Sequence, residues 1–268
     1  MVFSSKVSIV IPCYNQGQWL LEALSSIEQF STSSILEVII VNDGSTDPGT
    51  LEALRSLSRS KYTLLNQANC GLAAARNRGI ELARAEFVLP LDADNALRGA
   101  YFGSGLSRLV GDASIGVVYG NASYFGGRTG DWIVRDFRLE ELIKSNFIDA
   151  CALFRKSAWE SVGGYDERMP VMGWEDWDFW LRLANRGWGF VHIDEIAFDY
   201  RVREDSMIAT TNLHSRELQS YIFSKSELHR FSKMRSKMQM TKRRNLKIES
   251  IRQALERIWR RFCHRSPE

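Results

Sequence analysis

Residues 37–47 read EVIIVNDGSTD, an apolar run of strand-forming residues that ends in a cluster of turn residues. The same pattern occurs twice more, because residues 7–15 read VSIVIPCYN and residues 87–95 read FVLPLDADN. Each apolar run is short and does not alternate with polar residues, which is typical of a strand buried on both faces. The three stretches therefore predict three buried strands, each followed by polar residues at its carboxyl end.

Segments with helical spacing separate these runs. We expect helices over residues 18–29, 48–58 and 73–83, and a short strand at 62–65. Strands that alternate with helices in this way predict an α/β fold with a mainly parallel sheet, covered by helices on both faces.

The second half of the chain has a mixed pattern. A helix is expected to begin near Glu175 and to end at Gly187. The other expected elements are strands at 115–119, 151–154, 191–193 and 197–201, a hairpin or loop over 120–136, and a helical turn at 157–162.

The composition is that of an ordinary globular protein, with 268 residues, 44% apolar and 25% charged. It excludes a disordered chain, a collagen and a disulfide-stapled miniprotein. No apolar run approaches the roughly 18 residues that span a bilayer, and the first residues lack the pattern of a signal peptide. The four cysteines lie far apart and form no CxxC pair, so we expect reduced thiols and a cytoplasmic location.

The net charge of +3 is unevenly distributed. Residues 1–206 carry 20 Lys/Arg and 27 Asp/Glu, whereas residues 207–268 carry 15 Lys/Arg and 5 Asp/Glu. The pattern predicts an acidic body and a basic helical tail. The tail has apolar residues at helical spacing, which are Ile251, Leu255, Ile258, Trp259 and Phe262.

Two interpretations of the tail stay open. A basic amphipathic helix suits an anionic membrane surface, which would make the protein peripheral at the inner face of the membrane. It equally suits packing on the body or on a second copy in a homo-oligomer. Nucleic acid is not expected as a partner, because no recognised binding module accompanies the charge.

Polar residues at the carboxyl ends of neighbouring parallel strands are expected to meet at one edge of the sheet. Each cluster alone is typical of a turn, but three at the same edge favour a ligand pocket. Asp92 and Asp94 are the sharpest pair, since carboxylates at i and i+2 of an extended chain point the same way and repel. Such a pair suits Mg²⁺ or Mn²⁺ that takes its other ligands from water and phosphate. A solvated turn is the alternative interpretation.

Two further stretches carry candidate site residues. Residues 173–182 read GWEDWDFWLR, which places Asp176 at a helix start between Trp174 and Trp177. Asp176 is then either a capping acid or a general base, because the tryptophans would raise its pKa and the helix start would lower it. Residues 71–79 read GLAAARNRG, where small side chains let the backbone approach a ligand and Arg76 can meet a phosphate or a base.

In this order and spacing, the chain resembles family 2 glycosyltransferases of the GT-A fold. The matching motifs lie at residues 9–15, 41–47, 71–79, 91–94, 163–167 and 175–182. The resemblance covers roughly residues 6–206. It implies a GT-A domain at 1–206, with a nucleotide-binding half at 1–98 and an acceptor half at 99–206, followed by the basic tail at 207–268.

The resemblance also implies roles for matching residues. Asp94 and Asp92 would hold a divalent metal, and Asp176 would be the catalytic base. Glu175, beside the base, would also be catalytic, and it would shape the acceptor site together with Trp174. The residues implied for nucleotide binding are Pro12, Tyr14, Asn15, Asp43, Arg76 and Asp92.

Arg203 stands where many members of the family carry a histidine associated with the metal or the diphosphate. Arginine does not ligate metals, but it clamps phosphate through two hydrogen bonds. We therefore expect Arg203 to contact the diphosphate.

The expected function is an inverting glycosyltransferase that moves a sugar from a nucleotide-diphosphate sugar, a UDP-sugar, to a hydroxyl of a saccharide or lipid-linked acceptor. Its expected setting is the synthesis of a cell-surface or secreted polysaccharide. One alternative is a nucleotidyltransferase that makes nucleotide sugars. Such an enzyme needs a Gly-rich basic loop after the first strand to bind phosphate, and residues 12–17 do not have this composition. A second alternative is a non-catalytic sugar-binding scaffold. The sequence argues against this alternative because it contains four candidate site carboxylates, Asp43, Asp92, Asp94 and Asp176.

Overall fold

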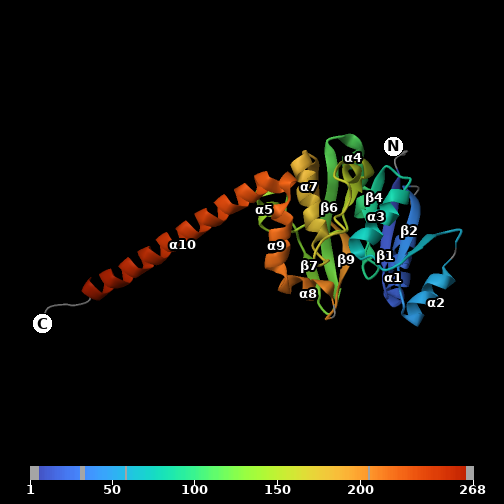
Figure 1. The fold of residues 1–268 in the computed structure, drawn as a ribbon, viewed down its shortest axis with the longest axis horizontal. Coiled ribbons are helices and arrows are strands. Elements are labelled where there is room, and N and C mark those ends of the chain that lie inside the picture. The colour runs from blue at the N-terminus through green and yellow to red at the C-terminus, as the bar shows by residue number, and fades with distance from the viewer. Residues whose placement is uncertain (1–5, 31–33, 58, 205, 264–268) are drawn as a thin grey trace. The chain divides into compact units, whose positions relative to one another are not determined.

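The computed structural model describes residues 6–30, 34–57, 59–204 and 206–263. The chain forms two compact units, Met1–Ile222 and Phe223–Glu268. The first unit confirms the expected α/β class, since its strands form one sheet with helices packed against it (Figure 1).

In the part of the chain that the structure describes, nine strands form this sheet, in the order β3-β2-β1-β4-β8-β6-β9-β5, with β7 paired to β6. The strands are β1 (Val7–Cys13), β2 (Ile35–Asp43), β3 (Thr63–Gln67), β4 (Phe87–Pro90), β5 (Ala96–Leu97), β6 (Ile115–Gly126), β7 (Gly130–Trp132), β8 (Leu153–Arg155) and β9 (Gly189–Val202).

The four strands expected in the first half are confirmed as β1 to β4, and they pair in parallel. Ile9 in the middle of β1 pairs with Val38 of β2 on one side and with Leu89 of β4 on the other. The carboxyl ends of these strands therefore meet at one edge, where Tyr14, Asp43 and Asp92 follow.

The second half differs from the expectation in one respect. The two strands expected at 191–193 and 197–201 are a single strand, β9, which pairs in parallel with β6. The register passes from Ile193 opposite Gly120 to Ile196 opposite Asn121, so Asp194 and Glu195 lie in a bulge. These two polar residues resemble a turn in the sequence, but the pairing resumes immediately after them. The segment 120–136 contains the β6–β7 hairpin.

Strands β8 and β5 run antiparallel to their neighbours, so the sheet is mixed at this end. Because β8 is antiparallel to β4, its first residues lie at the same edge of the sheet as the last residues of β4. The segment just before β8 is thereby brought beside the polar ends of the parallel strands.

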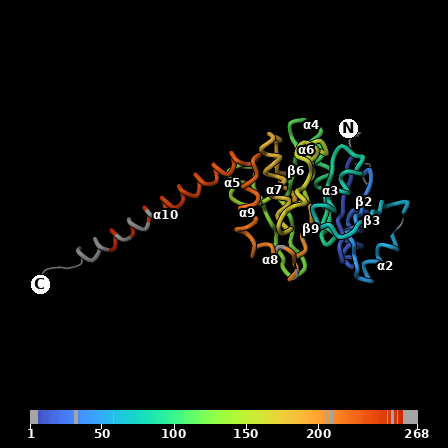
Figure 2. Tube along the Cα trace, in the orientation of Figure 1, coloured from blue at the N-terminus to red at the C-terminus, as the bar shows by residue number. Residues whose placement is uncertain are grey.

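Helices pack against the sheet. Those between residues 17 and 186 are α1 (Gly17–Glu28), α2 (Pro48–Ser56), α3 (Leu72–Leu82), η1 (Gly99–Phe102), α4 (Ser104–Gly111), α5 (Leu139–Lys144), α6 (Lys156–Ser161) and α7 (Glu175–Arg186). In Figure 2 the blue-to-teal elements of the first half lie together on one side of this unit, beside the green-to-gold elements of the second half.

Alternate residues of β1 face two different layers. Ile9 and Ile11 belong to a core cluster with Leu20 and Leu24 of α1, and Val10 faces α3. Helix α3 lies very close to the strands, because a Cβ built on Gly79 would be 2.4 Å from Val10 Cγ1. A glycine at this position of α3 therefore sets how deeply the helix sits on the sheet.

The boundary expected at residue 206 lies later in the structure. Helices α8 (Met207–Leu213) and α9 (Ser215–Ser224) follow β9. The Thr211 hydroxyl donates to the Met172 carbonyl at 2.7 Å, and Leu218 and Ile222 are buried. Residues 207–222 therefore pack as part of the first unit, although their sequence is polar.

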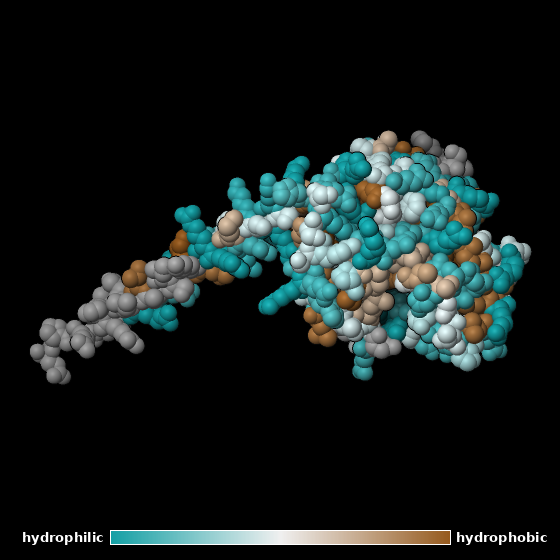
Figure 3. All heavy atoms as spheres, viewed as in Figure 1, coloured by the Kyte–Doolittle hydropathy of each residue, from teal (hydrophilic) through white to brown (hydrophobic). Residues whose placement is uncertain are grey.

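The second unit confirms the expectation of a helical tail. It contains η2 (Ser226–Leu228) and the 35-residue helix α10 (His229–Cys263). The described surface of α10 is mostly hydrophilic, with exposed Met240, Leu246, Ile248 and Leu255 among the charges (Figure 3). The side chains of Ile251, Ile258, Trp259 and Phe262 lie outside the described residues. Within the described ranges, no helix is long and apolar enough to cross a membrane.

Candidate active site

A cavity of about 920 Å³ lies where the sequence predicts a pocket, at the carboxyl ends of β1, β2 and β4. This volume is within the range of roughly 300–1,000 Å³ that small-molecule sites occupy. Among the residues that line it are Pro12, Tyr14, Asp43, Arg76, Asp92, Asp94, Asn146, Asp149, Trp174, Glu175, Asp176, Tyr200 and Arg203.

Asp92 and Asp94 lie just after β4, and each is ion-paired with a different arginine. Asp92 Oδ1 lies 2.6 Å from Arg76 Nη2, and Asp94 Oδ2 lies 2.8 Å from Arg203 Nη1. Burial raises the pKa of Asp94, and the neighbouring Asp92 carboxylate raises it further, while Arg203 opposes both effects. The repulsion expected from the sequence is therefore present, and cations offset it in part.

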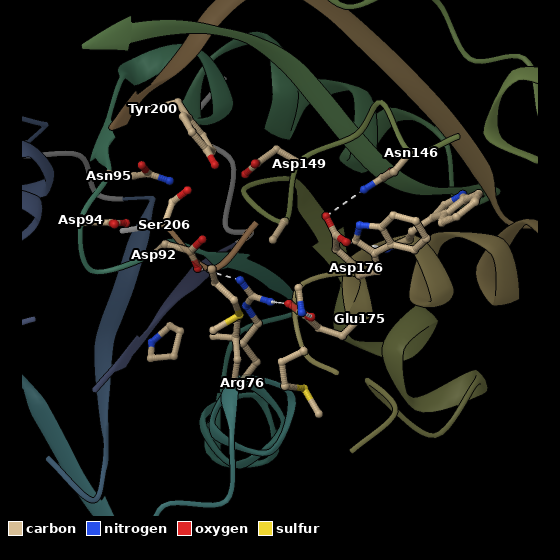
Figure 4. A pocket seen from close by; sticks show the side chains of 18 of the residues that line it. Arg76, Asp92, Asp94, Asn95, Asn146, Asp149, Glu175, Asp176, Tyr200 and Ser206 are labelled. Carbon is tan, nitrogen blue, oxygen red and sulfur yellow. Dashed lines mark hydrogen bonds and ion pairs between the residues drawn. The ribbon is translucent and has the colours of Figure 1, made fainter. Parts of the chain in front are cut away.

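Arg76 is completely enclosed at the floor of the cavity. Its Nη1 donates to Glu175 Oε1 at 2.5 Å while its Nη2 donates to Asp92, so one guanidinium joins α3, the end of β4 and the start of α7 (Figure 4). Burial alone would lower the pKa of Arg76, but the two carboxylates raise it above its ordinary value. The Nε atom is buried without a hydrogen-bond partner among the described residues.

Glu175 has both carboxylate oxygens engaged. Oε1 accepts from Arg76, and Oε2 accepts from the backbone N–H of Gly173 at 2.6 Å. The side chain is almost fully buried. The geometry therefore favours a role in fixing the loop before α7, and the catalytic and acceptor roles implied for Glu175 stay predictions.

Asp176 faces the cavity from the first turn of α7. Its Oδ2 accepts a hydrogen bond from Asn146 Nδ2 at 2.9 Å, and its Oδ1 accepts from the backbone N–H of Trp177 at 2.6 Å. Burial raises the pKa of Asp176 well above its ordinary value, and Glu175 and Asp149 add repulsion. Of the two opposing effects expected from the sequence, desolvation is the stronger.

The two tryptophans beside Asp176 have different positions. Trp177 is buried and donates from Nε1 to the Leu142 carbonyl at 2.7 Å. Trp174 lines the cavity and packs edge-to-face on Trp177, with ring centroids 5.2 Å apart. Trp177 therefore anchors α7, and Trp174 forms a wall next to the candidate base.

The opposite end of the cavity contains three of the residues expected around the nucleotide, Pro12, Tyr14 and Asp43. Asp43 accepts from Gln67 Nε2 and from the backbone N–H groups of Cys70 and Gly71, all at 2.8–2.9 Å. Gly71 has φ of 90°, which favours glycine, and it is the N-cap residue just before α3. Asp43 thus positions the start of the helix that carries Arg76.

Asn15 is not among the residues that line the cavity. Its Oδ1 accepts from the backbone N–H groups of Thr46 at 2.8 Å and Asp47 at 2.9 Å, and its own N–H donates to the Ser45 hydroxyl. Asn15 therefore connects the loop after β1 to the loop after β2, and it holds these two loops together without lining the cavity. Direct nucleotide contact by Asn15 stays a prediction that this position does not favour.

Arg203 lies at the cavity wall, where the carboxyl end of β9 reaches the same edge. Its guanidinium stacks over the Trp19 ring, 3.9 Å from the centroid, while it pairs with Asp94. Arg201 lies beside it and donates from Nε to the Asp94 carbonyl at 2.9 Å. Both arginines are therefore held next to the carboxylate pair.

Sequence reasoning missed several polar residues of the cavity, among them Asn146, Asp149 and Tyr200. Asp149 precedes β8, and burial followed by repulsion from Asp92 raises its pKa to about 7. Burial, followed by Asp149, also raises the pKa of the Tyr200 phenol. The missing signal was strand direction, because only an antiparallel β8 brings residues 146–149 to this edge.

The carboxylate pair fits a divalent cation. Asp92 and Asp94 offer hard oxygen donors whose mutual repulsion a cation would relieve. Among the described residues, no group of three or more His, Cys, Asp or Glu side chains is arranged to hold a metal. The remaining ligands would therefore come from water and from the phosphates of a bound nucleotide, and the ion would compete with Arg203 for Asp94.

Solved structures with the same fold are GT-A glycosyltransferases. S. aureus TarS in complex with UDP-GlcNAc superposes with a TM-score of 0.63 over 76% of this chain and 61% of that chain, at 20% sequence identity. The mannosyltransferase PcManGT from Pyrobaculum calidifontis, in complex with GDP-Man and Mn²⁺, gives a TM-score of 0.62 over 83% of this chain and 64% of that chain, also at 20% identity.

The sequence specifies the family within this class. The family model described as Glycosyl transferase family 2 matches residues 8–163. The chain belongs to that family.

Curated relatives are longer than this chain. It is 27% identical over 231 residues to a chondroitin synthase of Pasteurella multocida (strain Pm70), which covers 84% of this chain and 23% of the relative. It is 34% identical over 130 residues to the uncharacterized glycosyltransferase YibD of Escherichia coli (strain K12), and this match covers 48% of this chain and 37% of the relative. The chain thus spans less than half the length of these relatives.

Proposed function

We propose that this chain transfers a sugar from a UDP-sugar to a hydroxyl of a saccharide or lipid-linked acceptor, with inversion at the anomeric carbon. The observation that carries the proposal is that one cavity contains the Asp92/Asp94 pair and, across from it, Asp176. A leaving diphosphate needs positive charge, and an attacking hydroxyl needs a base. In this cavity the Asp92/Asp94 pair can hold a cation for the diphosphate, and Asp176 can act as the base for the hydroxyl.

The nucleotide would lie at the β1–β2 end of the cavity. Tyr14 is 46% exposed there and offers an aromatic face to the base, next to Pro12 and Asp43. Support for a uridine nucleotide comes from TarS, whose structure contains UDP-GlcNAc. PcManGT contains GDP-Man, so the donor panel of any test must include a guanosine nucleotide.

The diphosphate would lie against the Asp92/Asp94 pair and Arg203. Asp94 and Asp92 would hold a divalent ion, Mn²⁺ or Mg²⁺, that neutralises charge on the leaving diphosphate. Arg203 would exchange its ion pair with Asp94 for a two-point contact with phosphate, because a guanidinium presents pairs of parallel N–H donors. Its stacking on Trp19 limits how far it moves.

In the transfer step, the acceptor hydroxyl oxygen forms a bond to the anomeric carbon on the face opposite the diphosphate. The bond from that carbon to the diphosphate oxygen breaks, and the diphosphate leaves with the electron pair. Asp176 Oδ accepts the proton of the hydroxyl, and its raised pKa makes it a stronger base than an ordinary aspartate. One displacement of this kind inverts the configuration. Trp174 would form the acceptor wall.

The setting and the tail are part of the proposal. We place the reaction in the synthesis of a cell-surface or secreted polysaccharide, on the cytoplasmic side of a membrane. Helix α10 would lie on the anionic lipid surface, since its described face combines basic residues with exposed Met240, Leu246 and Ile248. Pairing of two copies through α10 is the other candidate.

The experiment that tests the function measures nucleotide release from UDP-GlcNAc, UDP-glucose, UDP-galactose and GDP-mannose, each with Mn²⁺, with Mg²⁺ and with EDTA. We expect release from one UDP-sugar that needs a divalent ion. Proton NMR of the fresh product gives its anomeric configuration. Retention of configuration, or release that EDTA does not reduce, would contradict the proposed mechanism.

A further inference from the structure

Asp149 is a carboxylate in the cavity that the transfer step above does not use. It lies in the segment between α5 and β8, and its Oδ1 accepts from the backbone N–H of Cys151 at 2.8 Å. In the described part of the chain, no group donates a hydrogen bond to Oδ2, and Asp149 lines the cavity. One oxygen is therefore structural, and the other is available to a ligand.

The position of Asp149 is intermediate between the two ends of the reaction. Repulsion from Asp92 and Asp94 acts on Asp149, and Asp149 in turn acts on Asp176. Figure 4 shows Asp149 between Tyr200 and Asp176, across the cavity from Asp92. It therefore stands close both to the carboxylates on the diphosphate side and to the base.

The proposed function fixes what must occupy this space. The transferred sugar is bonded to the diphosphate, and its anomeric carbon must face the hydroxyl that Asp176 holds. The sugar ring therefore lies between the Asp92/Asp94 pair and Asp176, which is where Asp149 stands. A pyranose ring presents hydroxyl donors all round its edge, and a carboxylate oxygen is a strong acceptor for them.

We propose that Asp149 binds the transferred sugar of the donor through a hydrogen bond from a sugar hydroxyl to Oδ2, and so contributes to donor selection. The inference rests on the proposed function. It accounts for a partly buried carboxylate whose second oxygen faces the cavity and accepts from no donor in the described part of the chain, because a sugar hydroxyl would supply that donor. In this proposal Asp149 is not a ligand of the metal ion, and it does not accept the proton of the acceptor hydroxyl.

The test compares bare nucleotide with nucleotide sugar. Asp149→Asn preserves the size of the side chain and the acceptor for the Cys151 N–H, but replaces the free oxygen by an amide that donates. Glu140→Gln is the matched control, because Glu140 is an exposed carboxylate on α5 outside the cavity lining. Calorimetric titration with Mn²⁺ present, on the alkaline side of the Asp149 pKa of about 7, uses UDP and the four nucleotide sugars named above.

We expect wild type and Glu140→Gln to bind one nucleotide sugar with the same preference over UDP. In Asp149→Asn that preference should fall by about tenfold or more, the scale of a lost hydrogen bond to a charged group, while UDP affinity changes by less than about threefold. Deoxy and epimeric forms of the preferred sugar should lose less affinity in the variant than in wild type, because the contact they lack is already gone.

Three results would overturn the inference. An equal loss of UDP and nucleotide-sugar affinity would place Asp149 at the diphosphate or its ion. Unchanged affinities with a displaced acid limb of the pH–rate profile would make Asp149 a base. Unchanged affinities and an unchanged profile would leave it structural. If wild type itself binds no nucleotide sugar better than the bare nucleotide, the proposed function fails first, and this inference falls with it.

Discussion

Arg76 and Glu175 stand 99 positions apart in the chain, yet the guanidinium of one lies 2.5 Å from the carboxylate of the other. The same guanidinium contacts Asp92, so a single buried cation balances a carboxylate from each half of the site. Both halves of the cavity are thereby held in one arrangement before any ligand binds.

Removing this cation should destabilise the fold. Arg76→Ala leaves the buried Glu175 carboxylate without its partner, and we expect a loss of about 3 to 5 kcal/mol in the free energy of unfolding. Urea denaturation measures it. Arg78→Ala, on the exposed face of the same helix, is the control and should change stability by less than about 1 kcal/mol. Equal losses in the two variants would show that the buried pair contributes little.

Asp94→Ala should abolish transfer and remove the dependence of UDP affinity on Mn²⁺. The reason is that Asp94 is the carboxylate whose charge Asp92 and burial disfavour, and a cation relieves both effects. Calorimetric titration of UDP, with Mn²⁺ and with EDTA, distinguishes wild type from the variant. A variant that retains the Mn²⁺ effect would show that the ion binds elsewhere.

Asp176→Asn should leave nucleotide-sugar affinity nearly unchanged and reduce turnover by at least about a hundredfold, the usual scale for a lost general base. Single-turnover kinetics at saturating donor separates the two quantities. Turnover above about a tenth of the wild-type value would move the role of base to another residue.

The pH–rate profile should report the same residue. Because the base acts ionised and its pKa is raised, turnover should fall with decreasing pH from well above the ordinary range of an aspartate. Asn146 donates to the Asp176 carboxylate and so favours the ionised form. Asn146→Ala should therefore move the acid limb to still higher pH, and a shift toward lower pH would contradict the assignment.

Asp149 gives a pH dependence of stability with a definite sign. Its pKa rises from 3.8 to about 7 in the native state, so the native protein retains a proton that the unfolded chain has lost between these values. The free energy of unfolding should therefore fall as pH increases from about 4 to about 7. Relative to wild type, Asp149→Asn should gain stability over this window, measured by urea denaturation at several pH values. A constant difference would contradict the raised pKa.

Truncation after Ser224 should preserve the cavity and weaken binding to anionic vesicles. The cut is placed there because Gln219 lines the cavity and Ile222 is buried. A shorter protein that ended near residue 212 would lose both residues and damage the site. Each basic residue near an anionic surface contributes about 1 kcal/mol, and salt screens it. Cosedimentation with anionic and neutral vesicles at two salt concentrations measures the effect. Equal pelleting of both proteins would reject the membrane role.

The sequence predicted most of the fold because its first half consists of locally determined elements. The apolar runs at Ile9 and Ile39 and the turn at Gly44 each depend only on neighbouring residues, so β1 and β2 were found with the correct direction. The continuous strand β9 was not predicted, because its bulge at Asp194 and Glu195 is stabilised by pairing with β6, a long-range contact.

The site was predictable only in part, for a similar reason. Asp43, Asp92 and Asp176 follow strands or begin a helix, and local pattern reveals such positions. The ion pairs of Arg76 with Glu175 and of Arg203 with Asp94 were not predicted, because each joins residues about a hundred positions apart in the chain. The sequence did not identify Asp149 as a cavity residue, because its position at this edge of the sheet depends on the antiparallel direction of β8.

The close packing of Gly79 against β1 predicts how substitutions at this position should behave in a genetic selection. A methyl group at this position would overlap Val10 Cγ1 and lift α3 from the sheet, and Arg76, one turn earlier on the same helix, would withdraw from Asp92 and Glu175. Gly79→Ala should therefore behave as a loss-of-function allele without any contact with the cavity. Val10→Ala should act as a partial second-site suppressor, because it removes the methyl group at 2.4 Å while Val41 Cγ2 stays 3.1 Å from the new methyl group. A selection for regained activity in a Gly79→Ala background should therefore recover changes inside β1.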